Sequence, residues 1–138
     1  MEKARKGGAM VVIDGSHGEG GPSLVRTALS MAALTQQPVR IEGVRANTPY
    51  PGVRPEDLML ARTLAKATAA EITGNEPGSA SLGFLPARLP KGVTGVVEIP
   101  EDRDGPGVAN AVVILASLAP VLCRSGVYNT ISALGETY

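Results

Sequence analysis

The sequence predicts an α+β fold in which a β-α-β-α-β-β unit is followed by one further helix and one further strand. Three observations predict this fold. Short β-branched runs alternate with longer segments whose apolar residues recur at helical spacing. Proline stands at the first position of two helical segments, where its missing N–H breaks no hydrogen bond. Hydrophobic residues make up 43% of the chain and aromatic residues only 3%, so we expect a core of Ala, Val, Leu and Ile between closely packed layers.

The first half of the unit begins with a short β-branched strand over residues 10–13, which ends at the turn starting with Asp14. A helix is expected from Pro22, because apolar residues follow it at helical spacing. The segment 35–38, with the sequence TQQP, ends this helix. The alternating residues 39–44 then predict a second strand.

The second half of the unit begins with a helix that starts at Pro55. Glu56 and Asp57 fall in its first turn, where acidic side chains favour the positive end of the helix dipole. The apolar face of this helix is expected to continue as far as Ile72.

Two strands are then predicted over residues 80–87 and 93–100, joined by the turn RLPKG. Residues 108–123 are apolar on nearly all sides, which favours a helix buried between layers. Pro120 is expected to kink this helix or to end its regular part. Residues 127–138 predict a last strand.

These elements divide the chain into a flexible N-terminus over residues 1–10, a first repeat over residues 11–100 and the start of a second repeat over residues 101–138. The second repeat is incomplete, and one helix with one strand leaves apolar surface and a sheet edge uncovered. We therefore expect either self-association or a C-terminal part that is missing from this sequence.

Composition excludes several classes of protein. Thirteen basic residues balance thirteen acidic ones, which disfavours a strong non-specific nucleic-acid binder. The single cysteine, Cys123, excludes an internal disulfide, favours a reducing compartment and is expected to be buried among apolar neighbours. No signal peptide is visible, and the longest apolar run is too short to span a bilayer. A cytoplasmic protein without membrane contact is expected.

The loop between the first strand and the first helix, DGSHGEGGPS over residues 14–23, contains four glycines. Glycine lets a ligand approach the backbone, and a helix N-terminus offers free N–H groups and partial positive charge. These features suit an anion site. The spacing matches neither a Walker loop nor a dinucleotide-binding loop, so a plain tight turn is the alternative.

The segment IDGSHGEGGPSLVRTALS resembles the N-terminal signature of the RNA 3′-terminal phosphate cyclases, D-G-x-x-G-E-G-G-G-x-x-x-R-x-A-L-S. The resemblance continues through RIEGVRANTPYPGV and ends in the strand that contains SALGET. It implies a repeated β-α-β-α-β-β fold and an ATP-dependent enzyme that converts an RNA 3′-phosphate to a 2′,3′-cyclic phosphate. In that family a histidine is adenylated first and passes AMP to the terminal phosphate.

The resemblance also implies roles for individual residues. Glu19 matches an acidic residue near the ATP phosphates and would hold a divalent metal, Mg²⁺ or Mn²⁺. Arg26 matches a phosphate-contacting arginine, and Arg45 matches an arginine expected to bind phosphate through charge-assisted hydrogen bonds. Without the resemblance, a solvated surface charge is the alternative for both arginines. The implied nucleotide- and phosphate-binding residues are Gly18, Glu19, Gly20, Gly21, Arg26 and Arg45.

The sequence departs from the family pattern at several positions. Thr48 stands where the family has a second arginine, Glu56 and Asp57 stand where Gln and His are usual, and Ala116 replaces a glutamine. The acidic segment 101–107, EDRDGPG, precedes the third helix, where its carboxylates would repel a phosphate.

The adenylated histidine of the family lies far downstream of the region matched here. The one histidine present, His17, sits in the glycine loop, where a neutral imidazole making a local hydrogen bond is expected rather than a nucleophile. No catalytic residue is therefore assigned within this chain.

Three hypotheses remain open. The first is a cyclase-family enzyme that acts on RNA 3′ ends with ATP once its remaining part is supplied. The second is a non-catalytic relative that binds RNA or assists ribosome assembly. The third is an oligomer that uses the repeat for another ligand.

Overall fold

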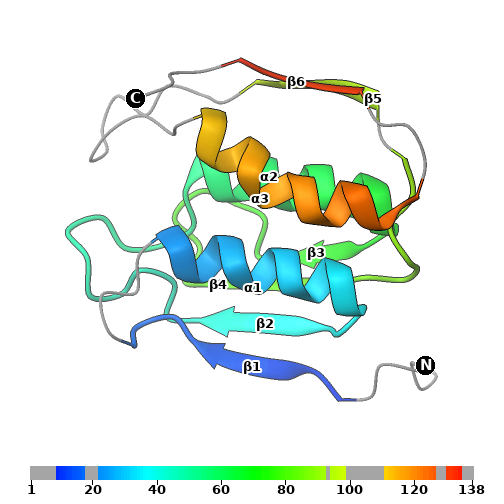
Figure 1. The fold of residues 1–138 in the computed structure, drawn as a ribbon. Helices are drawn as coiled ribbons and strands as arrows, with labels where there is room; N and C mark the ends of the chain where they lie inside the picture. The colour runs from blue at the N-terminus through cyan, green and yellow to red at the C-terminus, as the bar shows by residue number, and fades with distance from the viewer. Residues whose placement is uncertain (1–8, 18–21, 93, 99–110, 127–129, 135–138) are drawn as a thin grey trace.

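The computed structural model describes residues 9–17, 22–92, 94–98, 111–126 and 130–134. Within them the fold is mixed α+β, as the sequence predicts, with three helices, a four-stranded mixed sheet and a two-stranded parallel sheet. Figure 1 shows the helices as a layer between the two sheets. This layering buries helix surface on both sides.

The larger sheet has the strand order β1-β2-β4-β3. β1 runs parallel to β2, and β4 runs antiparallel to both β2 and β3. Along β2, Val39 and Ile41 are buried while the exposed Arg40 and Glu42 form an ion pair of 3.1 Å, so the sheet has one apolar face. The strands span Val11–Asp14 (β1), Val39–Glu42 (β2), Glu71–Thr73 (β3) and Ser81–Leu85 (β4).

The two helices that cover this sheet begin at the predicted prolines. α1 spans Pro22–Thr35 and α2 spans Pro55–Thr68. At both starts the fixed φ of proline suits the first helical turn. α2 ends at Ala69, which adopts a left-handed backbone conformation (φ 52°) and donates its N–H to the carbonyl of Ala65.

The core is almost entirely aliphatic, as its composition predicts. Phe84, the one phenylalanine of the chain, is fully buried at the centre of the sheet, opposite Val39 on β2 and Ile72 on β3. The helices contribute mainly leucine and alanine to the same cluster. Its fully buried aliphatic members include Leu29, Ala33, Ile41, Leu60, Ala61, Leu64, Ala67, Leu82, Leu118 and Val121.

The prediction that the second helix continues to Ile72 is wrong. Ile72 lies in β3, a three-residue strand that the sequence analysis missed. Its apolar side chain coincides with the helical spacing, but the chain turns at Ala69 before reaching it. A three-residue strand is too short to show a period of two that would distinguish it from the end of a helix.

The strand predicted over residues 93–100 exists as β5 (Thr94–Glu98) but does not pair with β4. It lies parallel to β6 (Thr130–Leu134), with α3 (Ala111–Arg124) between them along the chain. Parallel strands need such a crossover, which α3 supplies here. The proposed division of the chain at residues 100 and 101 stays a prediction.

α3 is less enclosed than the sequence predicts. Leu118 and Val121 are buried, but Ala119 and Pro120 are exposed, and so is Cys123, which the sequence analysis placed in the core. Apolar residues on all sides of the helix concealed which side faces solvent. The helix continues past Pro120 to Arg124.

Replacing Phe84 by alanine is expected to lower the free energy of unfolding by about 3–5 kcal/mol, because it removes the largest fully buried side chain among the described residues and leaves a cavity. Chemical denaturation measures the change. Leu89→Ala is the control, since this side chain is 53% exposed and its loss should change stability by less than about 0.5 kcal/mol. Similar losses in the two variants would contradict the assignment of the core.

Candidate functional site

Two loops meet at one end of the four-stranded sheet. The first follows β1 and leads toward the glycine loop, and the second connects β2 to α2. The side-chain amide of Asn47 donates a hydrogen bond to the carbonyl of Ser16 at 2.7 Å, which joins the two loops. The beginning of the glycine loop is thereby fixed beside the segment that carries Arg45.

Arg45 has an unusual backbone conformation for a non-glycine residue, with φ 51°. Its carbonyl accepts hydrogen bonds from the N–H (3.1 Å) and the hydroxyl (2.8 Å) of Thr48, which close a tight turn. Further along, Gly52 N–H bonds the carbonyl of Val44 at 2.8 Å. A left-handed residue costs on the order of 1 kcal/mol, so these bonds hold a strained turn in place.

The side chain of Arg45 turns inward and forms a buried ion pair with Asp57. Nη2 of Arg45 lies 2.9 Å from Oδ1 of Asp57, and the two residues are 5% and 1% exposed. The other carboxylate oxygen of Asp57 accepts a hydrogen bond of 2.9 Å from the backbone N–H of Arg54, just before α2. Asp57 therefore caps the start of α2 and binds the preceding turn at the same time.

Burial opposes the charge on both members of this pair. It raises the pKa of Asp57 to about 6, despite the attraction of Arg45 and the hydrogen bond from Arg54. Burial also lowers the pKa of the Arg45 guanidinium, against the opposing attractions of Asp57 and Glu56. The more exposed Glu56 carboxylate lies 3.8 Å from Nη2 of Arg45. Two acidic groups thus share one buried guanidinium.

Arg26 and Arg54 add further positive charge around the pair. Arg26 lies in the second turn of α1, is half-buried and contacts the hydroxyl of Ser23 at 3.4 Å. Its charge acts on both members of the pair, as a minor cause that lowers the pKa of Asp57 and of Arg45. Arg54 stacks over the ring of Tyr50, 5.7 Å from its centre. Three arginines therefore gather near the start of α2.

Of the residues that the resemblance implies, the structure describes Arg26 and Arg45, and the charge of Arg26 has a minor effect on the pKa of Arg45. The reading of Arg45 as a solvated surface charge is wrong, because the residue is buried and paired. The remaining four, Gly18, Glu19, Gly20 and Gly21, lie outside the described residues, as does the acidic segment 101–107.

Two of the positions that depart from the family pattern, Thr48 and Asp57, have visible structural roles. Thr48 closes the turn at Arg45, and Asp57 neutralises Arg45. Ala116 and Arg26 line the same hollow between α1 and α3, with a volume of about 260 Å³. His17 is exposed and donates its backbone N–H to the carbonyl of Asp14 at 3.3 Å.

Sequence reasoning missed Asn47 and Arg54. Asn47 was one polar residue in a turn-rich segment, and nothing in its spacing pointed to Ser16. Arg54 precedes Pro55 and therefore occupies the N-cap position of the predicted helix, which was the available signal.

The arginines suit a phosphate group. Nε of Arg45 is a buried donor with no hydrogen-bond partner among the described residues. Such a donor is costly unless a ligand or water satisfies it, and guanidinium groups bind phosphate oxygens through charge-assisted hydrogen bonds. Glu56 and Asp57 act in the opposite direction, because they already neutralise part of this charge. Because part of the positive charge is already neutralised, these donors suit an anion with few negative charges better than one with many.

A metal site depends on residues that the structure does not describe. In the described ranges, no three His, Cys, Asp or Glu side chains gather closely enough to hold a metal ion. Glu19, the implied ligand, is outside those ranges. The described helices also include none with the length and hydrophobicity needed to cross a bilayer.

Comparison with known proteins matches the chain to one family. The family model described as RNA 3′-terminal phosphate cyclase covers residues 17–138. The RNA 3′-terminal phosphate cyclase of Methylococcus capsulatus is 36% identical over 126 residues, which are 91% of this chain and 35% of that protein. The protein of the same name from Pyrococcus furiosus is 38% identical over 114 residues, 82% of this chain and 31% of that protein. The chain thus spans about a third of the length of these curated relatives.

The raised pKa of Asp57 makes stability depend on pH. The folded protein binds this proton more tightly than the unfolded chain, so the stabilisation is fully present below pH 3.8 and is lost as pH rises through about 6. This stabilisation amounts to about 3 kcal/mol, because one pKa unit corresponds to about 1.4 kcal/mol. The difference in unfolding free energy between the native chain and Asp57→Asn should fall by most of this amount between about pH 4 and pH 7.

Asp14→Asn provides a control in which the contribution to stability changes with pH in the opposite direction. Hydrogen bonds from the side chain and backbone of Ser16 lower the pKa of the exposed Asp14, so its contribution is lost as pH falls. Denaturation curves at several pH values measure both effects. A difference for Asp57→Asn that does not change with pH would contradict the assignment.

Proposed function

The chain belongs to the RNA 3′-terminal phosphate cyclase family, and from this premise we propose that it forms the phosphate-binding part of an ATP-dependent RNA 3′-phosphate cyclase. The reaction would convert an RNA 3′-phosphate to a 2′,3′-cyclic phosphate. The observation that carries the proposal is the buried Arg45, whose Nε has no hydrogen-bond partner among the described residues and whose turn is joined through Asn47 to the loop that leads to the glycines.

In this proposal the chain binds and orients phosphate groups. Backbone N–H groups of Gly18, Gly20 and Gly21 and the N-terminus of α1 would hold the phosphates, and Glu19 would hold Mg²⁺ or Mn²⁺. Arg26 and Arg45 would neutralise the phosphate oxygens. Bound ATP would supply the AMP group that activates the terminal phosphate.

The chain does not by itself supply the nucleophile that receives AMP. Its single histidine, His17, lies on the surface at the start of the glycine loop. The resemblance assigns adenylation to a histidine further along the polypeptide. A C-terminal part or another chain would therefore have to provide that residue, in a cytoplasmic enzyme that processes RNA ends.

Replacing Arg26 by glutamine is expected to weaken binding of ATP with Mg²⁺ by about 10-fold or more, since a hydrogen bond to a charged group contributes about 1.5–3 kcal/mol. Isothermal titration calorimetry measures the affinity. Arg62→Gln is the matched control, because Arg62 is an exposed arginine on α2. Equal weakening in both variants, or no binding of ATP to the native chain, would count against a phosphate role for Arg26.

The second candidate is a non-catalytic member of the family that binds RNA or assists ribosome assembly. The Arg45–Asp57 pair favours it, because a carboxylate occupies the guanidinium that an active enzyme would offer to phosphate. The 2.9 Å contact would have to open, or Arg45 would have to use its remaining donors. The Arg45–Asp57 pair is equally compatible with the third hypothesis, in which the repeat binds a different ligand.

Incubation with α-labelled ATP and Mg²⁺ or Mn²⁺ tests whether the chain carries the nucleophile. We expect no acid-labile AMP on the protein, and attachment abolished by His17→Ala would overturn this expectation. RNA binding that weakens steeply with salt, without nucleotide binding, would favour the non-catalytic candidate. ATP binding that depends on Arg26 would favour the enzyme.

A further inference from the structure

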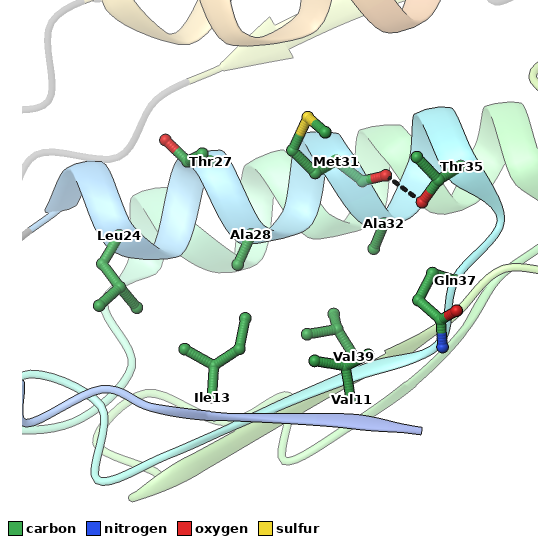
Figure 2. Close-up of a pocket in the computed structure, with 10 residues that line it drawn as sticks. All are labelled: Val11, Ile13, Leu24, Thr27, Ala28, Met31, Ala32, Thr35, Gln37 and Val39. Atoms are coloured by element: carbon green, nitrogen blue, oxygen red, sulfur yellow. Dashed lines mark hydrogen bonds between the residues drawn. The ribbon is translucent and has the colours of Figure 1, made fainter. Parts of the chain in front are cut away.

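An apolar groove lies between β1 and α1 at one edge of the four-stranded sheet. Its volume is about 340 Å³, and all the residues that line it are uncharged. In Figure 2, Leu24, Ala28 and Ala32 point from α1 toward the strands, where Val11 and Ile13 form the opposite wall. None of the residues that line the groove belongs to the ion pair described above.

The outer side of β1 offers backbone hydrogen-bonding groups. The N–H of Val11 donates to the carbonyl of Pro38 (2.9 Å), and the N–H of Gly15 donates to the carbonyl of Glu42 (2.7 Å). Backbone groups of successive strand residues point to opposite sides, so the N–H and C=O of Val12 point away from β2. Within the described part of the chain no strand lies along this side.

The two edges of this sheet differ in how they discourage pairing with other chains. β3, at the far edge, has only three residues, and its exposed positions carry Glu71 and Thr73. Short, polar or charged edges are how monomeric proteins prevent edge pairing. β1 is also short, with four residues, and it ends at the exposed Asp14, but residues 9–13 are all apolar, and Val11 and Val12 are 45% and 58% exposed.

We propose that a second copy of this chain pairs with β1 in antiparallel orientation, about a two-fold axis at Val12. Both hydrogen bonds at the axis would join Val12 to Val12 of the second copy, and Val11 would lie opposite Ile13. Val11 and Ile13 face the groove, so the grooves of the two copies would join into one apolar layer under both α1 helices. The two larger sheets would form one continuous sheet.

Charge supports a second copy as the occupant. The chain has no net charge at pH 7, so two copies do not repel each other as a whole. In the proposed register no like charges stand opposite each other, since Asp14 lies opposite Met10. A small apolar ligand would fill the groove but leave the backbone groups of Val12 unpaired. A second β1 strand would cover the groove and would also pair the backbone groups of Val12.

Sedimentation velocity of the native chain, with a reductant because Cys123 is exposed, tests the proposal. We expect a monomer–dimer equilibrium, with the dimer increasing with concentration.

Val12→Lys places two like charges at the axis and should weaken dimerisation at least about 10-fold. Val12→Pro should do the same, because it removes the outward N–H without breaking a bond to β2. Thr73→Lys, the same charge on the opposite edge, should leave the dimer unchanged.

Amide hydrogen exchange supplies a measurement that needs no variant. The Val12 N–H should become protected as the native chain is concentrated, because it is free in the monomer and bonded in the dimer. A monomer at every concentration, which would leave the groove to another segment or ligand, would overturn the proposal. A dimer that persists in both Val12 variants, or that Thr73→Lys weakens equally, would overturn it as well.

Discussion

The buried contact between Arg45 and Asp57 determines how the segment between β2 and α2 lies. One carboxylate binds the guanidinium and the backbone N–H of Arg54, so the turn and the helix start are fixed together. Removing one partner of such a pair typically costs about 3–5 kcal/mol, because the other charge stays buried. The contact therefore adds to the hydrogen bonds of Thr48 and Gly52 that hold the strained turn at Arg45.

The same contact creates a conflict between stability and ligand binding. The family resemblance assigns Arg45 to phosphate, yet its charge is shared with Asp57 and Glu56. A phosphate would gain charge-assisted hydrogen bonds but would bring further negative charge toward two carboxylates. Protonation of Asp57, whose pKa is raised to about 6, would remove one of the two negative charges that such a phosphate would meet.

Local chemistry predicted much of the fold, and pairing between distant residues accounts for most of what it missed. Pro22 and Pro55 identified the starts of α1 and α2, because proline constrains its own backbone. The mixed α+β composition and aliphatic core also followed from residue type. Ile72 was assigned to the wrong element because three residues carry too little periodicity. β5 was predicted as a strand, but a short turn does not reveal a distant pairing partner such as β6.

The candidate site was predictable only as far as its residue types. Arg26 and Arg45 were identified by motif, but burial of Arg45 against Asp57 depends on how the turn folds, which spacing does not encode. The exposure of Cys123 was hidden for a related reason, since a uniformly apolar helix gives no indication of its outer side. Family membership, in contrast, rests on one long motif and is confirmed by the match over residues 17–138.

The scarcity of aromatic rings has a consequence for how this core can change. Ala33, Ala61 and Ala67 are fully buried in the helix layer, where they permit close approach of neighbouring backbones. A larger side chain at any of them would wedge the layers apart, at a typical cost of about 1–3 kcal/mol. A larger side chain at one of these positions would therefore keep the layers at their present distance only if a neighbouring side chain became smaller.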